Sequence, residues 1–140
     1  MLKTEFIPMS LRSAYLSMHR QTNSHLTSFG ITADQFVCLL SLAEDDGITQ
    51  QELVQRCSSD PNTLREMLKR LEKRGLVSRK AHPTDGRARY VTITEEGREI
   101  LVELNKAVKP IHKRLEKLLD EKEIKKFTEM LKLIAEEMAK

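Results

Sequence analysis

The strongest constraint on the fold is a pair of helix starts close together in the middle of the chain. Thr49 is followed three residues later by Glu52, which is the capping-box pattern that opens a helix. Asp60 precedes a proline, and an N-cap carboxylate before a proline at the first helical position opens a second helix. We therefore expect two short helices, over residues 49–57 and 61–74, joined by a tight turn.

The sequence period changes after Gly75, which is expected to end the second helix in the left-handed conformation. Residues 76–79 and 90–93 are short β-type runs, and Pro83 and Gly86 between them favour a turn. Two short helices followed by a β-hairpin are typical of the winged helix-turn-helix. The hairpin is then the wing.

Amphipathic helices flank this unit on both sides. We expect one over residues 9–29 and another that opens at the capping box of Thr32 and Gln35. After the hairpin, Thr94 and Asp120 begin two further helices. The predicted fold class is mainly α with a small β-hairpin wing, and 140 residues are enough for one compact domain.

The terminal helices carry more apolar surface than a small domain can cover alone, which indicates an oligomer interface. We assign residues 1–30 and 95–140 to a helical dimerisation region. Residues 31–94 form the predicted winged helix-turn-helix, DNA-binding region.

Positive charge is concentrated in the middle of the chain. Residues 49–94 carry ten Lys/Arg and five Asp/Glu, a net of +5, whereas residues 1–48 have three and five, a net of −2. Residues 95–140 have eleven of each and balance. A polyanion would therefore be bound by the central third.

The helix over 61–74 is the expected reading element, because its leucines face inward and its polar side chains face outward. Asn, Thr and Arg near the start of such a helix can reach base edges in the major groove. Serines in the preceding turn can hold phosphates. The expected DNA-binding side chains of this region are Ser58, Ser59, Asn62, Thr63, Arg65, Glu66, Lys69 and Arg70.

The stretches TQQELVQRCSSDPNTLREMLKRLEKRGLVSR and PTDGRARYVTITEEG resemble the MarR-type transcriptional regulators. The resemblance covers essentially the whole chain and is strongest from Thr49 to Gly97. It implies two-fold dimers formed by the terminal helices, palindromic operators, and a response to small aromatic acids or oxidants. His82, Gly86 and Ile93 depart from the family's pattern.

The resemblance also implies roles for single residues. Asp85 would hold the shape of the wing and Arg87 would enter the minor groove, with Arg89 as a phosphate partner. An effector pocket, for a small aromatic compound, would lie among the first, second and long fifth helices. Its expected lining is Tyr15, Met18, His19 and Phe36, although ordinary interface packing explains these residues equally well.

The remaining reactive side chains do not indicate a chemical site. Cys38 and Cys57 are expected to pack structurally, because a thiol sensor needs an exposed, electropositive surrounding. The four histidines have no metal-ligand spacing, and no catalytic pattern stands out. We therefore expect no enzyme activity, no metal and no cofactor.

The sequence thus predicts a homodimeric, sequence-specific DNA-binding regulator, most simply a repressor, that binds a palindromic operator and is released by an effector. The alternative is a winged-helix module that docks a protein partner without reading DNA. No apolar run reaches the roughly 18 residues of a membrane span and no export signal is present, so we expect a cytoplasmic protein. The operator and its target genes, the effector, the choice between repressor and activator, and whether Cys38 or Cys57 senses oxidation stay open.

Overall fold

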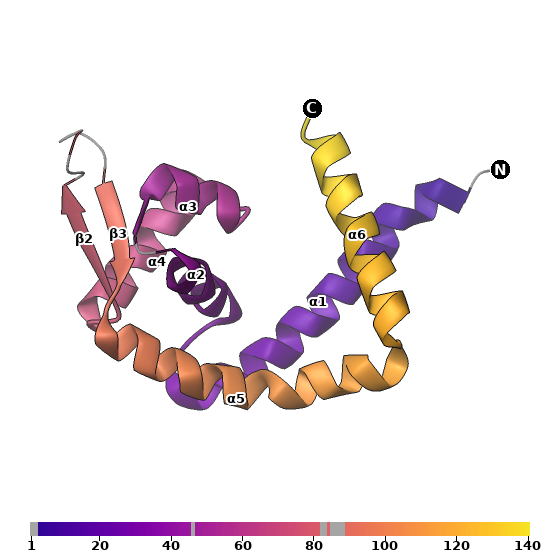
Figure 1. The fold of residues 1–140 in the computed structure, drawn as a ribbon, viewed down its shortest axis with the longest axis horizontal. Coiled ribbons are helices and arrows are strands. Elements are labelled where there is room, and N and C mark those ends of the chain that lie inside the picture. The colour runs from indigo at the N-terminus through magenta and orange to yellow at the C-terminus, as the bar shows by residue number, and fades with distance from the viewer. Residues whose placement is uncertain (1–2, 46, 82–83, 85–88) are drawn as a thin grey trace. The chain divides into compact units, whose positions relative to one another are not determined.

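The computed structural model describes residues 3–45, 47–81, 84 and 89–140 (Figure 1). The elements are η1 (Lys3–Phe6), α1 (Ile7–Leu26), η2 (Thr27–Phe29), α2 (Ala33–Glu44), β1 (Ile48–Thr49), α3 (Gln50–Arg56), α4 (Pro61–Lys73), β2 (Val77–Ala81), β3 (Arg89–Ile93), α5 (Glu95–Leu118) and α6 (Glu121–Met138). They form two compact units, the first ending at Ala107 and the second beginning at Val108, with α5 shared between them.

The predicted helix starts are confirmed by side-chain caps. The amide of Gln35 donates to the Thr32 hydroxyl at 3.1 Å, and the amide of Thr32 donates back to the Gln35 side chain at 3.0 Å. Asp120 makes the same reciprocal box at the start of α6. At Thr49 only the bond from the Glu52 amide forms among the described residues, at 3.1 Å. These caps satisfy amides that a helix cannot pair internally.

Glycines end two helices, and Gly75 does so as predicted. Gly30 follows η2 with φ 67°, and Gly75 follows α4 with φ 75°, both in the left-handed region that glycine adopts without strain. The first long helix differs slightly from the prediction over residues 9–29. It begins earlier, at Ile7, and its last turn tightens into the 3-10 segment η2.

The sheet has three antiparallel strands in the order β1-β3-β2. The hairpin pairs Val77 with Ile93 and Ala81 with Arg89, so both strands extend further into the wing than the sequence predicts. Strand β1 was not predicted. It pairs Ile48 with Val91, and two residues are too few to show an alternating pattern.

The core of the first unit lies among α2, α3, α4 and the sheet. Its fully buried side chains are Leu26, Cys38, Leu39, Leu42, Leu53, Leu64, Leu68, Leu71, Val91 and Leu104. Each buried leucine contributes about 1.5–3 kcal/mol. Figure 1 shows the hairpin beside α3 and α4, and the packing of α4 on β2 and of α3 on β3 accounts for this.

The second unit contains the end of α5 and all of α6. No residue of α6 is buried, and Phe127, Met130, Leu133 and Met138 are exposed. Among the described residues, no individual helix has the length and apolar composition to cross a bilayer. Lys3–Phe29 and Ala33–Glu44 meet that test only jointly, and they are bent by 83°.

Candidate nucleic-acid interface

The start of α4 is held by Asp60. Its carboxylate accepts from the amide of Thr63 at 2.9 Å and from the Thr63 hydroxyl at 2.7 Å. These bonds hold the pKa of Asp60 below its ordinary value, because they stabilise the charged carboxylate. The first turn of α4 is therefore fixed in the free protein.

The two sides of α4 are sharply different. Leu64, Leu68 and Leu71 are fully buried. The polar side chains expected to contact DNA are exposed on the other side, namely Asn62, Thr63, Arg65, Glu66, Lys69 and Arg70. This orientation is the one that a major-groove reading helix requires.

Two weak pairs link these exposed side chains along the helix. Arg65 donates to Asn62 at 3.2 Å, and Lys69 lies 3.3 Å from Glu66. Exposed pairs of this kind contribute little to stability, so the side chains can exchange partners on meeting DNA at small cost.

The turn between α3 and α4 is tight because Ser58 has φ 48°, an uncommon conformation for a residue other than glycine. The amide of Ser59 donates to the carbonyl of Val54 at 3.0 Å. Ser58 is exposed and Ser59 is half-buried, so the turn presents Ser58 next to the N-terminus of α4.

The base of the wing is tied to α4 and α5. Arg79 of β2 donates to Glu72 of α4 at 3.0 and 3.4 Å. Thr94 caps α5 as predicted, accepting from the Gly97 amide at 3.0 Å, and its hydroxyl also donates to the Gly75 carbonyl at 2.6 Å. A Cβ at Gly97 would meet the Leu76 carbonyl oxygen at 2.2 Å, so this corner admits only glycine.

The predicted wing contacts fall outside the part of the chain that the structure describes. Asp85, Gly86 and Arg87 are not described, nor is His82. Arg89 is described only by its backbone, which pairs with Ala81. The roles of Asp85, Arg87 and Arg89 therefore stay predictions.

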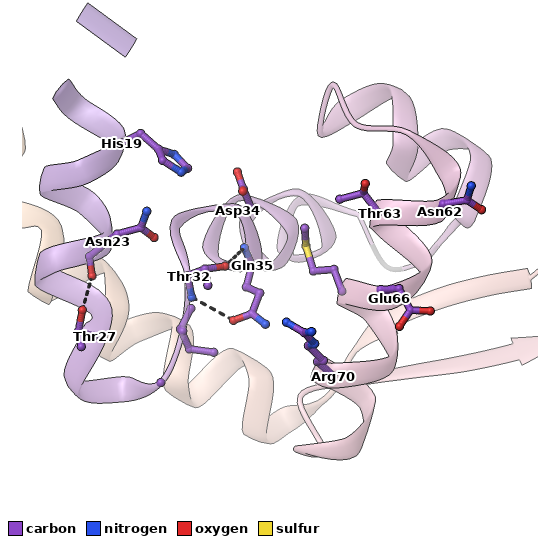
Figure 2. Close-up of a pocket in the computed structure, with 13 residues that line it drawn as sticks. His19, Asn23, Thr27, Thr32, Asp34, Gln35, Asn62, Thr63, Glu66 and Arg70 are labelled. Atoms are coloured by element: carbon purple, nitrogen blue, oxygen red, sulfur yellow. Dashed lines mark hydrogen bonds between the residues drawn. The ribbon is translucent and has the colours of Figure 1, made fainter. Parts of the chain in front are cut away.

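A cavity of about 860 Å³ lies between the α1–α2 junction and α4 (Figure 2). Its lining is His19, Asn23, Thr27, Gly30, Ile31, Thr32, Asp34, Gln35, Asn62, Thr63, Glu66, Met67 and Arg70. Four of these, Asn62, Thr63, Glu66 and Arg70, also belong to the side of α4 expected to contact DNA. An occupant of the cavity would therefore touch that side of the helix.

Of the four residues expected to line an effector pocket, only His19 lines this cavity. Phe36 is buried, whereas Tyr15 and Met18 are exposed on α1. Tyr15 lies one turn from His19, with the hydroxyl 3.4 Å from Nδ1. The sequence did not predict that Asn23 and Arg70 line a common cavity, because residues so far apart in the chain meet only in the fold.

Arg74 connects the C-terminal end of α4 to the rim of the cavity. Nη1 of Arg74 donates to the carbonyl of Gly30 at 3.0 Å. Arg74 thereby ties the end of α4 to the left-handed turn between α1 and α2.

The cysteines differ from one another in exposure. Cys38 of α2 is fully buried, as predicted, but Cys57 at the end of α3 is only half-buried. The neighbouring Cys57 side chain raises the pKa of Cys38, and the Cys38 side chain lowers the pKa of Cys57 to about 7. Among the described residues, no group of three His, Cys, Asp or Glu side chains is arranged to hold a metal ion.

The chain is similar in sequence and in structure to known proteins. Residues 31–88 match the family model described as the MarR family. The regulator HosA from a strain of Escherichia coli is 42% identical over 71 residues, which are 51% of this chain and 53% of HosA. The match therefore spans about half the length of that curated relative. A crystal structure of a mutant MarR from E. coli with operator DNA has a TM-score of 0.82 and 31% identity, covering 96% of this chain and 98% of that one.

The chain belongs to the MarR family. A second solved structure, NadR in complex with 4-hydroxyphenylacetate, has a TM-score of 0.85 at 26% identity, and the match covers 96% of each chain. Both likenesses extend over the terminal helices as well as the central unit. The predicted winged helix-turn-helix fold is thereby confirmed.

Proposed function

We propose that this MarR-family protein is a sequence-specific, DNA-binding transcriptional regulator. The observation that carries the proposal is the exposed polar side of α4, fixed at its start by Asp60, in a fold that matches MarR in complex with operator DNA. Arg65 and Arg70 would donate to base edges, and Asn62 is able to bind adenine in the same groove. Ser58 would hold a phosphate beside the helix start.

The wing completes the proposed interface. Arg87 would enter the minor groove, Asp85 would set the shape of the wing tip, and Arg89 would contact phosphate. Because the base of the wing is bonded to α4 through Arg79 and Glu72, a wing contact would also orient the reading helix.

The protein would act as a homodimer on a palindromic operator. The exposed apolar side of α6 and the exposed Phe6 and Met9 near the start of the chain supply surface for a second copy. A two-fold axis would set the two α4 helices about 34 Å apart, which is one turn of B-form DNA. A dimer that covers that length of promoter DNA would repress transcription.

We place effector release at the cavity of Figure 2. Arg70 and His19 could pair with the carboxylate of a small aromatic acid, while Ile31 and Met67 offer apolar contacts. NadR binds a compound of this class, 4-hydroxyphenylacetate. The cavity shares side chains with the side of α4 that would face DNA. The ligand and the operator would therefore favour different positions of this helix, and binding of the ligand would weaken binding of the operator.

We place the protein in the cytoplasm with its DNA and assign it no catalytic activity. Relatives that it matches, such as HosA, are transcriptional regulators.

The test is to select bound duplexes from a random pool and measure their affinity by fluorescence anisotropy. The selected palindrome should bind far more tightly than a scrambled duplex, with an affinity that falls steeply with salt. Equal affinity for the two would refute sequence-specific reading. It would leave the partner-docking module as the better explanation.

Single and double substitutions test which side chains contact the DNA. Arg65→Ala should weaken palindrome binding by about 1–3 kcal/mol and relax specificity at one base pair. The double variant with Arg87→Ala should weaken it further and leave the dimer intact. Lys132→Ala on α6, which removes an equal charge away from α4, is the matched control and should bind as the wild type does.

A further inference from the structure

A carboxylate lies at the centre of the exposed side of α4, where the proposed function places DNA. Successive residues of an α-helix are rotated by about 100°, because one turn takes about 3.6 residues. The buried side chains of Leu64, Leu68 and Leu71 define the inward direction of this helix. Glu66 is rotated by roughly 170° from the middle of that buried arc, so it points almost directly away from the core.

Positive side chains lie on both flanks of Glu66. By the same helical spacing, Arg65 and Lys69 lie on one flank and Arg70 lies on the other. The Lys69 ammonium is 3.3 Å from Oε1 of Glu66, and the two side chains are 54% and 66% exposed. A carboxylate can accept at both of its oxygens, so this exposed contact leaves Glu66 further capacity to accept a hydrogen bond.

Few groups of DNA are attracted to a carboxylate in this position. Phosphates repel it, so Glu66 cannot serve as a phosphate contact. In the major groove, N7 and O6 of guanine and O4 of thymine are acceptors, and the donors are N4 of cytosine and N6 of adenine. Adenine N6 lies beside the acceptor N7, whereas cytosine has no acceptor next to N4. Cytosine therefore suits the carboxylate best.

We propose that Glu66 is a specificity-determining residue, which selects cytosine at one position of each operator half-site by accepting a hydrogen bond from N4. This inference rests on the proposed function and names the base that the side chain reads. Lys69 partly offsets the charge of Glu66 as the helix approaches the phosphates. On DNA without cytosine at that position, the carboxylate finds no donor and weakens binding, so Glu66 raises specificity while it lowers overall affinity.

The test repeats the selection of bound duplexes with the wild type, Glu66→Ala and Glu66→Gln. The wild type should select cytosine at one position of each half-site, and replacing that base pair should weaken binding about 5- to 150-fold. Glu66→Ala should lose the preference at that position alone. Because this variant has one negative charge fewer on the side that would face DNA, it should also bind a scrambled duplex more tightly than the wild type does.

Glu66→Gln separates hydrogen bonding from charge. The glutamine amide both accepts and donates, and in the major groove it pairs with N7 and N6 of adenine. The selected base should therefore change from cytosine to adenine at the same position, which a purely structural role of Glu66 would not produce. Circular dichroism should show unchanged helix content in both variants, because the substituted side chain is exposed.

Glu129→Gln is the matched control, since it makes the same change at an exposed glutamate of α6. This variant should select the same sites as the wild type and bind them with the same affinity. A change of base in Glu129→Gln equal to that in Glu66→Gln would contradict the assignment.

Three results would overturn the role of Glu66 while leaving the proposed function intact. Identical selected sites for the wild type and both Glu66 variants would show that this side chain reads no base. A preference that depends on Glu66 but is not for cytosine would refute the assigned base. Weaker binding of Glu66→Ala to the scrambled duplex would give the charge effect the wrong sign.

Failure of the proposed function gives a different result. In that case the wild type itself does not discriminate the selected palindrome from a scrambled duplex, and the role of Glu66 falls with it.

Discussion

Helices α4 and α6 have the same amphipathic pattern, but only α4 finds cover for its apolar side within the chain. Leu68 of α4 is 0% exposed, and Leu64 and Leu71 are equally buried. On α6, Leu133 is 64% exposed and Phe127 is 47% exposed. An apolar stripe thus predicts that a surface will be covered, without predicting by what.

The difference in burial between α4 and α6 separates residues that stabilise the fold from residues that would stabilise a dimer. The apolar side of α4 holds this helix in the first unit, and its polar side is exposed, where our proposal places the DNA. The apolar side of α6 is left for a second copy of the chain, in our proposal. Breaking the first should unfold the protein, whereas breaking the second should separate the dimer.

The largest expected effect is at Leu68. Leu68→Ala should lower the free energy of unfolding by about 2–5 kcal/mol, because a fully buried leucine leaves a cavity. The measurement is urea unfolding at several protein concentrations. The matched variant is Leu133→Ala, whose smaller loss should depend on protein concentration, since a dimer contact is concentration-dependent. An equal, concentration-independent loss in both variants would remove the contrast between the helices.

Next in size is the dimer contact of α6. Phe127→Glu places a charge on the apolar side and should raise the dimer dissociation constant roughly thirtyfold, equivalent to about 2 kcal/mol. Analytical ultracentrifugation measures this constant, and circular dichroism should show unchanged helix content. Lys132→Glu, which puts the same side chain on the polar side of α6, is the control. A dimer that is equally stable in both variants would show that α6 is not the interface.

A smaller effect is expected at Arg74. Arg74→Met keeps much of the aliphatic chain but removes the hydrogen bond to the Gly30 carbonyl, which should cost about 0.5–1.5 kcal/mol. Lys73→Met is the neighbouring control and should change stability less. If Arg74→Met proves neutral in chemical denaturation, the bond to the α1–α2 turn does not hold α4.

The smallest effect is expected at the cap of α4 and depends on pH. The pKa of Asp60 is lowered in the folded protein, so its stabilising effect is complete above the ordinary carboxyl value of 3.8 and is lost as pH falls through the folded value. Asp60→Ala should therefore be less stable than wild type near neutral pH, and the gap should close in acid. Thermal unfolding across the acid range measures the gap. A gap that widens in acid would have the wrong sign.

The fold was largely predictable because its determinants are local. Thr32, Asp60 and Asp120 cap their own helices, and Gly30 and Gly75 end theirs, with partners only a few residues away. Strand β1 was missed because Ile48 and Thr49 become a strand only by pairing with β3. The extension of the hairpin into Lys80 and Ala81 has the same origin, since pairing continues where the hydrophobic pattern has stopped.

The candidate site was predictable in part. The outward residues of α4 follow from helical spacing alone, and the structure exposes them. The cavity could not be predicted, because Asn23 of α1, Gln35 of α2 and Arg70 of α4 are brought together only by packing. The wing contacts of Asp85 and Arg87 stay predictions.

The amino-acid sequence by itself determined where the helices begin and end, which side of each is apolar, and where the positive charge gathers. Those properties depend on neighbours within one helical turn. Tertiary structure decided which apolar sides are covered, placed Arg74 on the Gly30 carbonyl, and put the thiol of Cys57 against Cys38. These are contacts between residues far apart in the chain. Their geometry depends on how whole helices and strands pack, not on local conformational preference.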